Sequence, residues 1–364
     1  MKYLILKLLS LFYGMLVSLR NELFNLKILS SKEFDRPVIS IGNITAGGTG
    51  KTPHTEYIAQ LLKTNFKVGV LSRGYKRKTR GFQFVESTST VRQVGDEPLQ
   101  IKLKFDDLLV AVDSNRVRGI TKMLQSIPEP DVILLDDAFQ HQYVNPGINI
   151  LLTDYNRLIT KDSLLPHGRL RESAFNKYRA TIIIVTKCPK ELQPIDERII
   201  TKELEIRPYQ DLFFTNITYG SLMPVFPEDV SDIPADLKGG SSILLVTGIA
   251  NPKPLKQYLS ESHTKITELI FPDHHQFTAK NIDRIRTKFD EIERANKIIV
   301  TTEKDMVRFR DTQDIPDFIR QKMFYIPVGI SFLNNKGSEF NRKVFDYVKK
   351  NKGNIDFYSN SNWD

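Results

Sequence analysis

Apolar residues are spaced along this chain in two ways, and together they predict alternating strands and helices. Short continuous apolar runs, typical of buried parallel strands, are separated by stretches with apolar residues three and four positions apart, typical of helices. The predicted strands are 37–41, 67–71, 108–112, 132–135, 148–152 and 182–185, followed by 243–247, 266–271, 297–302 and 323–327. This alternation predicts an α/β fold in which helices wrap parallel sheets.

The N-terminus has a different pattern. Residues 3–19 are apolar apart from a few small or polar residues. The exceptions are Lys7, Ser10, Gly14 and Ser18, which recur at helical spacing and so lie on one face of a helix. Asn21 and Asn25 continue the same face. The stretch is short for a membrane span, which needs about 20 apolar residues, and no convincing signal-peptide cleavage site follows it. We expect a helix that lies in or against a bilayer with its small face docked on the protein. A buried core helix is the alternative.

A glycine-rich segment follows the first predicted strand and precedes a predicted helix. It reads Thr45-Ala46-Gly47-Gly48-Thr49-Gly50-Lys51-Thr52. Its glycines let backbone N–H groups converge on phosphates, Lys51 can reach the β and γ oxygens, and the Thr52 hydroxyl can ligate Mg²⁺. The helix that follows points its positive end at the same anion. The segment therefore predicts an ATP-binding P-loop, although Thr45 stands where a glycine is usual.

A pair of acids supports this interpretation. Asp136 and Asp137 end the apolar run 132–135, so a buried strand delivers them to the sheet edge where α/β proteins bind ligands. P-loop enzymes use such an acid for the Mg²⁺ that bridges the β and γ phosphates. The sequence does not distinguish which of the two would contact the metal.

Composition and charge narrow the classes of partner. The chain has 364 residues, a formal net charge of +9 and one cysteine, Cys188. A single cysteine excludes an internal disulfide and fits a reducing compartment. The positive charge suits an anionic membrane or substrate, whereas no nucleic-acid-binding module is recognisable and nucleic acid is not an expected partner. We expect a monomer.

The pattern also suggests where domains begin and end. We expect a membrane-associated helix at 1–30, a P-loop domain at 31–210 and a smaller α/β domain at 241–350. Between the two domains, the run from Leu212 to Val225 resembles a β-hairpin and leads into a Pro-, Asp- and Gly-rich stretch, so 211–240 is the expected hinge. The polar tail 351–364 is expected to be loose.

Several further motifs occur in an order that resembles one known family, the tetraacyldisaccharide 4′-kinases of lipid A synthesis. Besides the P-loop they are Leu71-Ser72-Arg73-Gly74-Tyr75, Gly95-Asp96-Glu97-Pro98, Asp136-Asp137-Ala138-Phe139-Gln140-His141, Leu170-Arg171-Glu172, Gly248-Ile249-Ala250-Asn251-Pro252, Phe271-Pro272-Asp273-His274-His275 and Thr302-Glu303-Lys304-Asp305. The resemblance extends over nearly the whole chain. The visible departure is Ala138, where the family usually has glycine.

The resemblance implies a reaction and assigns residues to it. The family transfers the ATP γ-phosphoryl group to the 4′-hydroxyl of a tetraacylated disaccharide 1-phosphate, giving lipid IVA at the cytoplasmic face of the inner membrane. Asp96 matches the family's base and His274 the imidazole paired with it, an arrangement that would form across the two domains. Arg171 and Glu172 match supporting positions, and His141 belongs to the same group of candidates. Arg116, with Arg118 and Arg169, is a candidate contact for the substrate phosphate or a surface arginine.

Two other functions fit parts of the sequence. A membrane-associated P-loop ATPase of the partitioning type has a similar loop but carries a lysine at the position of Ala46. A metal-dependent phosphoesterase would use the Asp273–His275 segment, but it needs additional acids early in the chain. The kinase interpretation accounts for more of the motifs than either.

Overall fold

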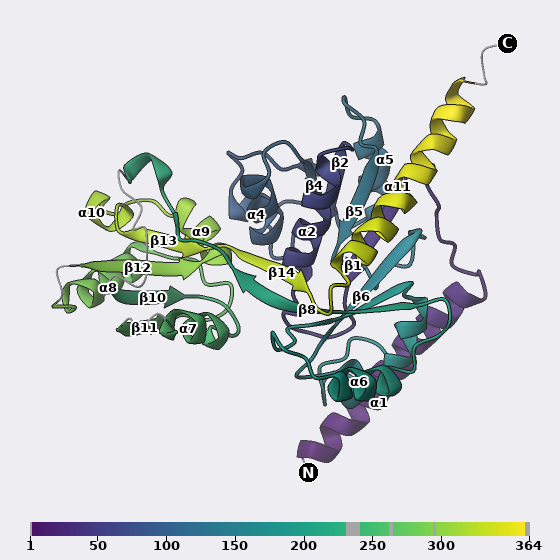
Figure 1. The fold of residues 1–364 in the computed structure, drawn as a ribbon, viewed down its shortest axis with the longest axis horizontal. Helices are drawn as coiled ribbons and strands as arrows, with labels where there is room; N and C mark the ends of the chain where they lie inside the picture. The colour runs from purple at the N-terminus through teal and green to yellow at the C-terminus, as the bar shows by residue number, and fades with distance from the viewer. Residues whose placement is uncertain (1, 231–240, 262–264, 294–295, 361–364) are drawn as a thin grey trace.

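The computed structural model describes residues 2–230, 241–261, 265–293 and 296–360, which form two α/β units of unequal size (Figure 1). Within these residues the larger unit is built on a nine-stranded sheet. In spatial order its strands are β14 (Val328–Phe332), β8 (Asp211–Tyr219), β7 (Ile182–Thr186), β6 (Ile148–Asp154), β1 (Val38–Gly42), β5 (Val132–Asp136), β2 (Val68–Ser72), β4 (Leu109–Val112) and β3 (Gln83–Phe84). The strands from β8 to β4 are parallel, and β14 and β3 pair antiparallel at the two edges.

Helices cover both faces of this sheet, which is why its strands are apolar runs rather than alternating ones. They are α1 (Lys2–Asn25), α2 (Lys51–Lys63), α3 (Val91–Val94), α4 (Asp96–Lys104), α5 (Arg116–Leu124), α6 (Pro194–Leu204) and α11 (Gly337–Asn360), with 3₁₀ turns at Ile159–Lys161 and Ala174–Arg179. Successive side chains of β5 point to opposite faces of the sheet and so pack in different cores. Leu134 packs in the core that α2, α4 and α11 share, whereas Leu135 packs in the core beneath α5.

The smaller unit repeats this design around five strands among the described residues. Their order is β11 (Ile266–Ile270), β10 (Ser242–Thr247), β12 (Lys297–Thr302), β13 (Met323–Ile326) and β9 (Met223–Pro224), of which only β9 is antiparallel. Its helices are α7 (Lys253–Ser260), α8 (Ala279–Asp290), α9 (Glu303–Arg310) and α10 (Asp317–Arg320), with a 3₁₀ turn at Pro227–Asp229. The alternating strands predicted from the sequence, and the α/β class with a large parallel sheet, are confirmed.

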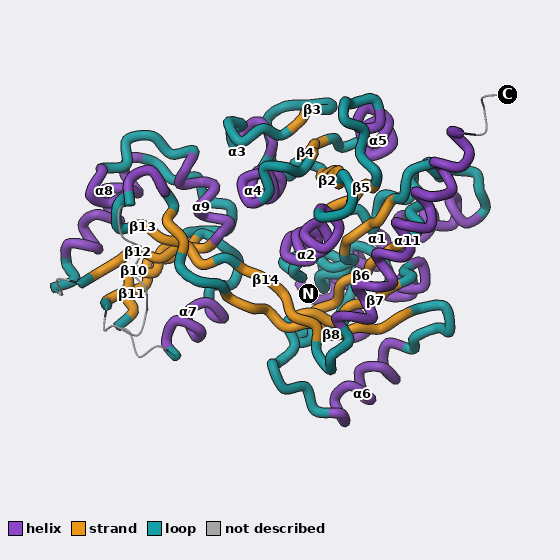
Figure 2. Tube along the Cα trace, turned by 45° about the horizontal axis from the view of Figure 1, so that its top comes forward, coloured by secondary structure: helices purple, strands orange, loops and turns teal. Residues whose placement is uncertain are grey.

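The connection between the units differs from the expected local hairpin. Strand β8 does not pair with β9; it pairs with β7 on one side and with β14 on the other. Strand β9 instead joins the smaller sheet beside β13. The two units are therefore linked by a ribbon of β8 and β14, visible as the two long strands at the centre of Figure 2. The pattern of residues in β8 identifies a strand, but its partner lies more than a hundred residues later, beyond the reach of local turn signals.

The C-terminal segment returns to the larger unit, so the expected second domain of residues 241–350 is not continuous in space. Strand β14 is an edge of the large sheet, and α11 packs on α2 with Phe340 and Val344 in the core. The Tyr347 hydroxyl contacts the backbone of Val38 at 3.3 Å. Helix α11 continues to Asn360 into the tail that was expected to be loose, and residues 361–364 lie outside the described part of the chain. Residues 231–240 of the expected hinge also lie outside it.

The N-terminal helix α1 lies along the larger unit and uses part of its small face to do so. The Ser10 hydroxyl donates to the Leu164 carbonyl at 2.6 Å, and Gly14 lies so close to Leu164 that a Cβ would approach its side chain to 2.6 Å. Asn21 is buried and donates to Glu172 at 3.2 Å. Lys7, Ser18 and Asn25, which share the expected stripe, are exposed. The opposite face is a continuous row of exposed apolar side chains, namely Tyr3, Leu4, Ile5, Leu8, Leu9, Leu11, Phe12, Met15, Leu16 and Leu19.

Candidate active site

The P-loop connects β1 to α2 at the carboxyl edge of the parallel strands. Gly47 and Gly50 have φ angles of 118° and 87°, in the region that glycine adopts without strain. A Cβ at Gly47 or Gly48 would meet no atom within 4 Å, so the backbone there borders open space. Two hydrogen bonds to Thr49 hold the loop in place. Asn43 donates to the Thr49 hydroxyl at 2.7 Å, and the Thr186 hydroxyl donates to the Thr49 carbonyl at 2.9 Å. The predicted strand–loop–helix arrangement is present, with an open cradle above it.

Asp136 and Asp137 lie at the end of β5 beside the P-loop, but they have different environments. Asp136 is buried and accepts from Thr55 at 3.0 Å and from Ser72 at 3.4 Å. Burial, together with the charges of Glu97 and Asp137, raises the pKa of Asp136 to about 7. Burial also acts on Asp137, but the cations of Lys51 at 3.7 Å and Arg171 at 3.2 Å outweigh it and lower the pKa of that carboxyl.

These two carboxyls fit a Mg²⁺ site completed by phosphates. A buried carboxyl with a pKa near neutrality is one that a divalent cation would convert to the ionised form. Within the described residues no group of three or more His, Cys, Asp and Glu side chains could hold a metal by itself. Phosphate oxygens and water supply the remaining ligands when Mg²⁺ binds with a nucleotide.

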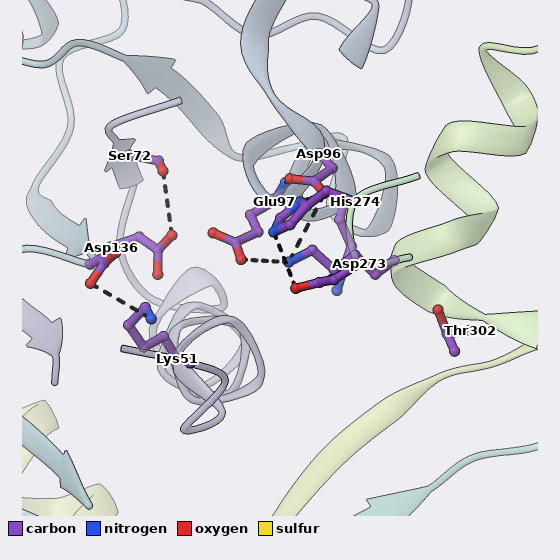
Figure 3. Close-up of polar contacts among 12 residues, drawn as sticks. Lys51, Ser72, Asp96, Glu97, Asp136, Asp273, His274 and Thr302 are labelled. Atoms are coloured by element: carbon purple, nitrogen blue, oxygen red, sulfur yellow. Dashed lines mark hydrogen bonds and ion pairs between the residues drawn. The ribbon is translucent and has the colours of Figure 1, made fainter. Parts of the chain in front are cut away.

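Asp96 and His274 meet across the two units, as Figure 3 shows. Asp96 is the first residue of α4 in the larger unit, and His274 follows β11 in the smaller one with a φ of 61°. The Nδ1 atom of His274 lies 2.8 Å from the Asp96 carboxylate, and both side chains are largely buried. Since Asp96 is ionised, Nδ1–H is the donor of this hydrogen bond.

Two cations of α9 also contact Asp96. The Arg308 guanidinium donates to the same carboxylate, and the Lys304 ammonium lies 4.0 Å from it. Burial raises the pKa of Asp96, but the hydrogen bond from His274 and the charges of Lys304 and Arg308 outweigh burial and hold that pKa well below its usual range. Asp96 therefore stays ionised at neutral pH.

Glu97 connects this cluster with the P-loop side. It forms an ion pair with Lys304 at 2.8 Å, and its charge is close enough to Asp136 to raise the pKa of that carboxyl. In Figure 3 the Glu97 carboxylate points from the Asp96–His274 side toward Asp136 and Lys51. The acid–imidazole pair and the P-loop therefore face one another within one site.

Three of the expected residues are held by contacts within the larger unit. Arg116 is buried, and its guanidinium donates to the carbonyls of Asp113 at 2.9 Å and of Asp136 at 3.1 Å. His141 accepts from the Arg116 backbone N–H at 3.3 Å, and burial, reinforced by the charge of Arg116, lowers the pKa of its imidazole to about 4. Glu172 is buried in a salt bridge with Arg179 at 2.8 Å.

Arg171 does reach the candidate site, and the structure adds residues that the sequence did not single out. Arg171 contacts Asp137 and the backbone and side chain of Asn43. Arg308 was not expected, although it lies one helical turn beyond Lys304 and so on the same face of α9. The Thr302–Asp305 motif lies beside Asp96 through Lys304. Lys187, which follows β7, contacts the Gly48 carbonyl of the P-loop.

Comparisons with known proteins agree on one family. Residues 2–347 match the model of the tetraacyldisaccharide-1-P 4′-kinase family. The chain is 48% identical to the tetraacyldisaccharide 4′-kinase of Phocaeicola vulgatus over 347 residues, 95% of each chain. It is 47% identical to that of Bacteroides thetaiotaomicron, over 96% of this chain and 94% of the other. The crystal structure of LpxK from Aquifex aeolicus in complex with ATP superposes with a TM-score of 0.74 at 26% identity, covering 96% of this chain and 100% of that one. This chain belongs to the tetraacyldisaccharide 4′-kinase family.

Proposed function

We propose that this chain transfers the γ-phosphoryl group of ATP to the 4′-hydroxyl of a tetraacyldisaccharide 1-phosphate, giving lipid IVA. The observation that carries the proposal is the position of the Asp96–His274 pair opposite the P-loop in one site. A phosphoryl transferase needs the acceptor hydroxyl and the γ-phosphate in line, and it needs a group that orients the hydroxyl and accepts its proton.

Asp96 has the properties of the group that orients the acceptor. Its carboxylate accepts the hydroxyl proton as the new O–P bond forms and the bond from the γ-phosphorus to the bridging oxygen breaks. An acid with so low a pKa is a weak base, so the proton moves late, when the acceptor oxygen is already partly bonded to phosphorus. Because that transition state is loose, orientation contributes more than basicity. His274 holds the carboxylate in place through Nδ1–H.

The charged groups on the P-loop side bind and neutralise the nucleotide phosphates. We assign the β and γ oxygens to Lys51, with the backbone of Thr45 to Thr52 around the phosphates. Thr52 and one of Asp136 and Asp137 would hold Mg²⁺, which supplies charge neutralisation across the β and γ phosphates when bound. Arg171, held by Asp137 and Asn43, lies where it can support the same charge.

Helix α1 is the proposed attachment to the membrane. It is the one helix in the described residues that is long and apolar enough to cross a bilayer, yet it lies along the protein body with one face exposed. An exposed face such as this one, with Met15 at 69% and Phe12 at 62% exposure, suits the acyl region of a lipid surface. We propose that the protein lies at the cytoplasmic face of the inner membrane as a monotopic monomer, since the P-loop and the Asp96–His274 pair come from the same chain.

The partitioning-type ATPase alternative is not favoured. Such a switch has no use for a second unit that delivers an imidazole to an acid at the P-loop, and the family match extends over both units. The two functions also predict different acceptors for the phosphoryl group, water in one case and a lipid hydroxyl in the other.

The test is the transfer of label from γ-³²P-ATP by detergent-solubilised protein, with and without tetraacyldisaccharide 1-phosphate. We expect label in a lipid product only when the disaccharide is present, resolved by thin-layer chromatography. A disaccharide that lacks the free 4′-hydroxyl is the matched control and should accept no label. Label released only as inorganic phosphate, at a rate that the lipid does not change, would overturn the proposal.

A further inference from the structure

A second charged cluster joins the two units outside the candidate active site. Glu56 in α2 and Glu303 at the start of α9 are both buried, each with 3% of its surface exposed. Lys104, the last residue of α4, reaches both carboxylates, with Nζ 2.7 Å from Glu56 and 2.9 Å from Glu303. One cation therefore connects the P-loop helix, the helix of Asp96 and a helix of the smaller unit.

The remaining oxygens of the two acids are also satisfied. Gln100 donates to the second oxygen of Glu56 at 2.8 Å, and the Val328 backbone N–H donates to the second oxygen of Glu303 at 2.9 Å. Val328 is the first residue of β14, which is one strand of the ribbon between the units. The cluster thus also holds the end of that ribbon next to the smaller unit, where Val328 pairs with Tyr219 two residues after β13 ends.

Removal of the lysine charge would make this arrangement unfavourable. Burial and the nearby charge of Glu303 already raise the pKa of Glu56 to about 7, and Lys104 opposes that rise. Two buried carboxylates without a cation repel one another or must take up a proton. Either way the attraction that brings α9 toward α2 and α4 is lost.

The position of Glu303 connects this cluster with the site. Glu303 begins α9, and the next residue, Lys304, and then Arg308 are the cations at Asp96. Asp96 begins α4 and Lys104 ends it. Helices α4 and α9 are therefore held together by ion pairs at both ends of α4: those of Asp96 and Glu97 within the site, and that of Lys104 outside it.

We propose that Lys104 is a positioning residue for phosphoryl transfer: through Glu303 it holds α9 against α2 and α4, so that Lys304 and Arg308 remain at Asp96. The inference rests on the proposed kinase function for its kinetic consequence. Its structural consequence, the placement of α9, is independent of that function.

The structural consequence is tested by hydrogen exchange of the full-length protein. Lys104→Met should increase the exchange rate of amides in α9 and β14 at least tenfold, with α5 and β6 unchanged. Lys63→Met is the matched control, because Lys63 pairs at 3.0 Å with exposed Asp107 beyond the end of α4, within the larger unit. Lys104→Arg should restore slow exchange. Unchanged exchange in Lys104→Met would overturn the proposal even if the protein is an active kinase.

The kinetic consequence is tested by a double-mutant cycle. Lys104→Met should lower kcat at least tenfold with KM for ATP within about twofold, since the P-loop itself is intact. If Lys104 acts through the cations of α9, adding Lys104→Met to a protein in which both cations are already replaced, by Lys304→Met and Arg308→Met, should lower kcat by less than twofold more. Multiplicative losses would show that Lys104 acts by another route and would overturn the proposal. Should Lys104→Met not fold, Glu303→Gln keeps the side-chain size and enters the same comparisons. If the wild-type protein transfers no phosphate to lipid, the proposed function fails and hydrogen exchange still decides the placement of α9.

Discussion

His274 donates a 2.8 Å hydrogen bond to Asp96, although 178 positions separate the two residues and they belong to different units. Neither unit alone contains the pair. It forms because the β8–β14 ribbon joins the smaller sheet to the larger unit, and His274 of the smaller unit meets the first residue of α4. Any motion that separates the units would separate the pair and open the site to water. This contact therefore couples phosphoryl transfer to the approach of the two units.

The P-loop lysine provides the first prediction. Lys51→Met should lower kcat for phosphoryl transfer by about 10²–10³, the typical cost of removing one group that stabilises transition-state charge. Steady-state assays at saturating ATP measure this loss. Lys63→Met, at the other end of α2, is the control and should keep wild-type kcat. An equal loss in both variants would mean that α2 was damaged and that Lys51 had no specific role.

His54 predicts a pH dependence of stability. It is buried; Nδ1–H donates to the Gly50 carbonyl at 2.7 Å, and Nε2 accepts from the Thr215 hydroxyl at 3.1 Å. Burial lowers the pKa of His54 from 6.5 to about 4. Between these values the unfolded chain binds the proton and the folded one does not, so stability is present above pH 6.5 and falls as the pH drops toward 4. The full loss from this group is about 3 kcal/mol.

Thermal or urea unfolding at pH 7.5 and pH 5 measures that dependence. His54→Gln should unfold more readily at pH 7.5 and show a smaller difference between the two pH values than the wild type does. His141, whose pKa is also lowered to about 4, should contribute a separate share, which His141→Gln removes. A wild-type protein equally stable at both pH values would contradict the neutral, buried state of His54.

Arg116 is predicted to stabilise the fold and not to bind substrate directly. Its guanidinium donates to the carbonyls that lead into the Asp136–Asp137 turn, and its side chain is among the most buried in the protein. Arg116→Met should lower the free energy of unfolding by about 3 kcal/mol, the range expected when buried carbonyls lose their donors. Arg118→Met, which alters an exposed arginine on the same helix, is the comparison. A normal unfolding curve with a raised KM for the lipid would contradict this assignment.

The exposed face of α1 predicts binding to anionic lipid vesicles. Leu8→Gln combined with Leu16→Gln removes two side chains that are more than half exposed, so the fold should be unaffected while the fraction bound to vesicles falls severalfold. Co-sedimentation measures the fraction bound. Ile195→Gln with Ile199→Gln, which alters an exposed apolar pair on α6, is the matched control. Equal vesicle binding by all three proteins would place the lipid contact elsewhere.

The sequence predicted local structure better than long-range pairing. Each predicted apolar run coincides with a strand, because burial on both faces makes a strand visible within a few residues, whereas the edge strands β3 and β14 were not predicted. The partner of β8 and the return of α11 to the large sheet were not predictable in this way, since Tyr219 pairs with Val328 and Val38 contacts Tyr347 only in the folded chain. Domain boundaries drawn along the sequence therefore misassigned the C-terminal segment.

In the site, too, residues that are close in sequence were easier to predict than contacts between distant segments. The P-loop residues and Asp136 could be placed because a strand, a loop and a helix are contiguous in sequence. The Asp96–His274 pair followed from family resemblance, and the structure brings the two together. Arg308 could not be found, because one arginine among many has no local signature and its role depends on packing between two units. Arg116 was expected either to contact the substrate phosphate or to lie on the surface, and its burial could not be predicted from residue type.

The central claim is that Asp96 and His274 serve the acceptor hydroxyl, and single-turnover transfer of label from bound γ-³²P-ATP to the lipid tests it most directly. Asp96→Asn keeps the shape of the side chain but removes its charge, and should slow transfer at least a hundredfold while the affinity for ATP stays within about threefold. His274→Ala should slow transfer less, by about tenfold to a hundredfold, the size of a general acid–base contribution. Wild-type rates in both variants would contradict the account, and so would a loss confined to ATP binding.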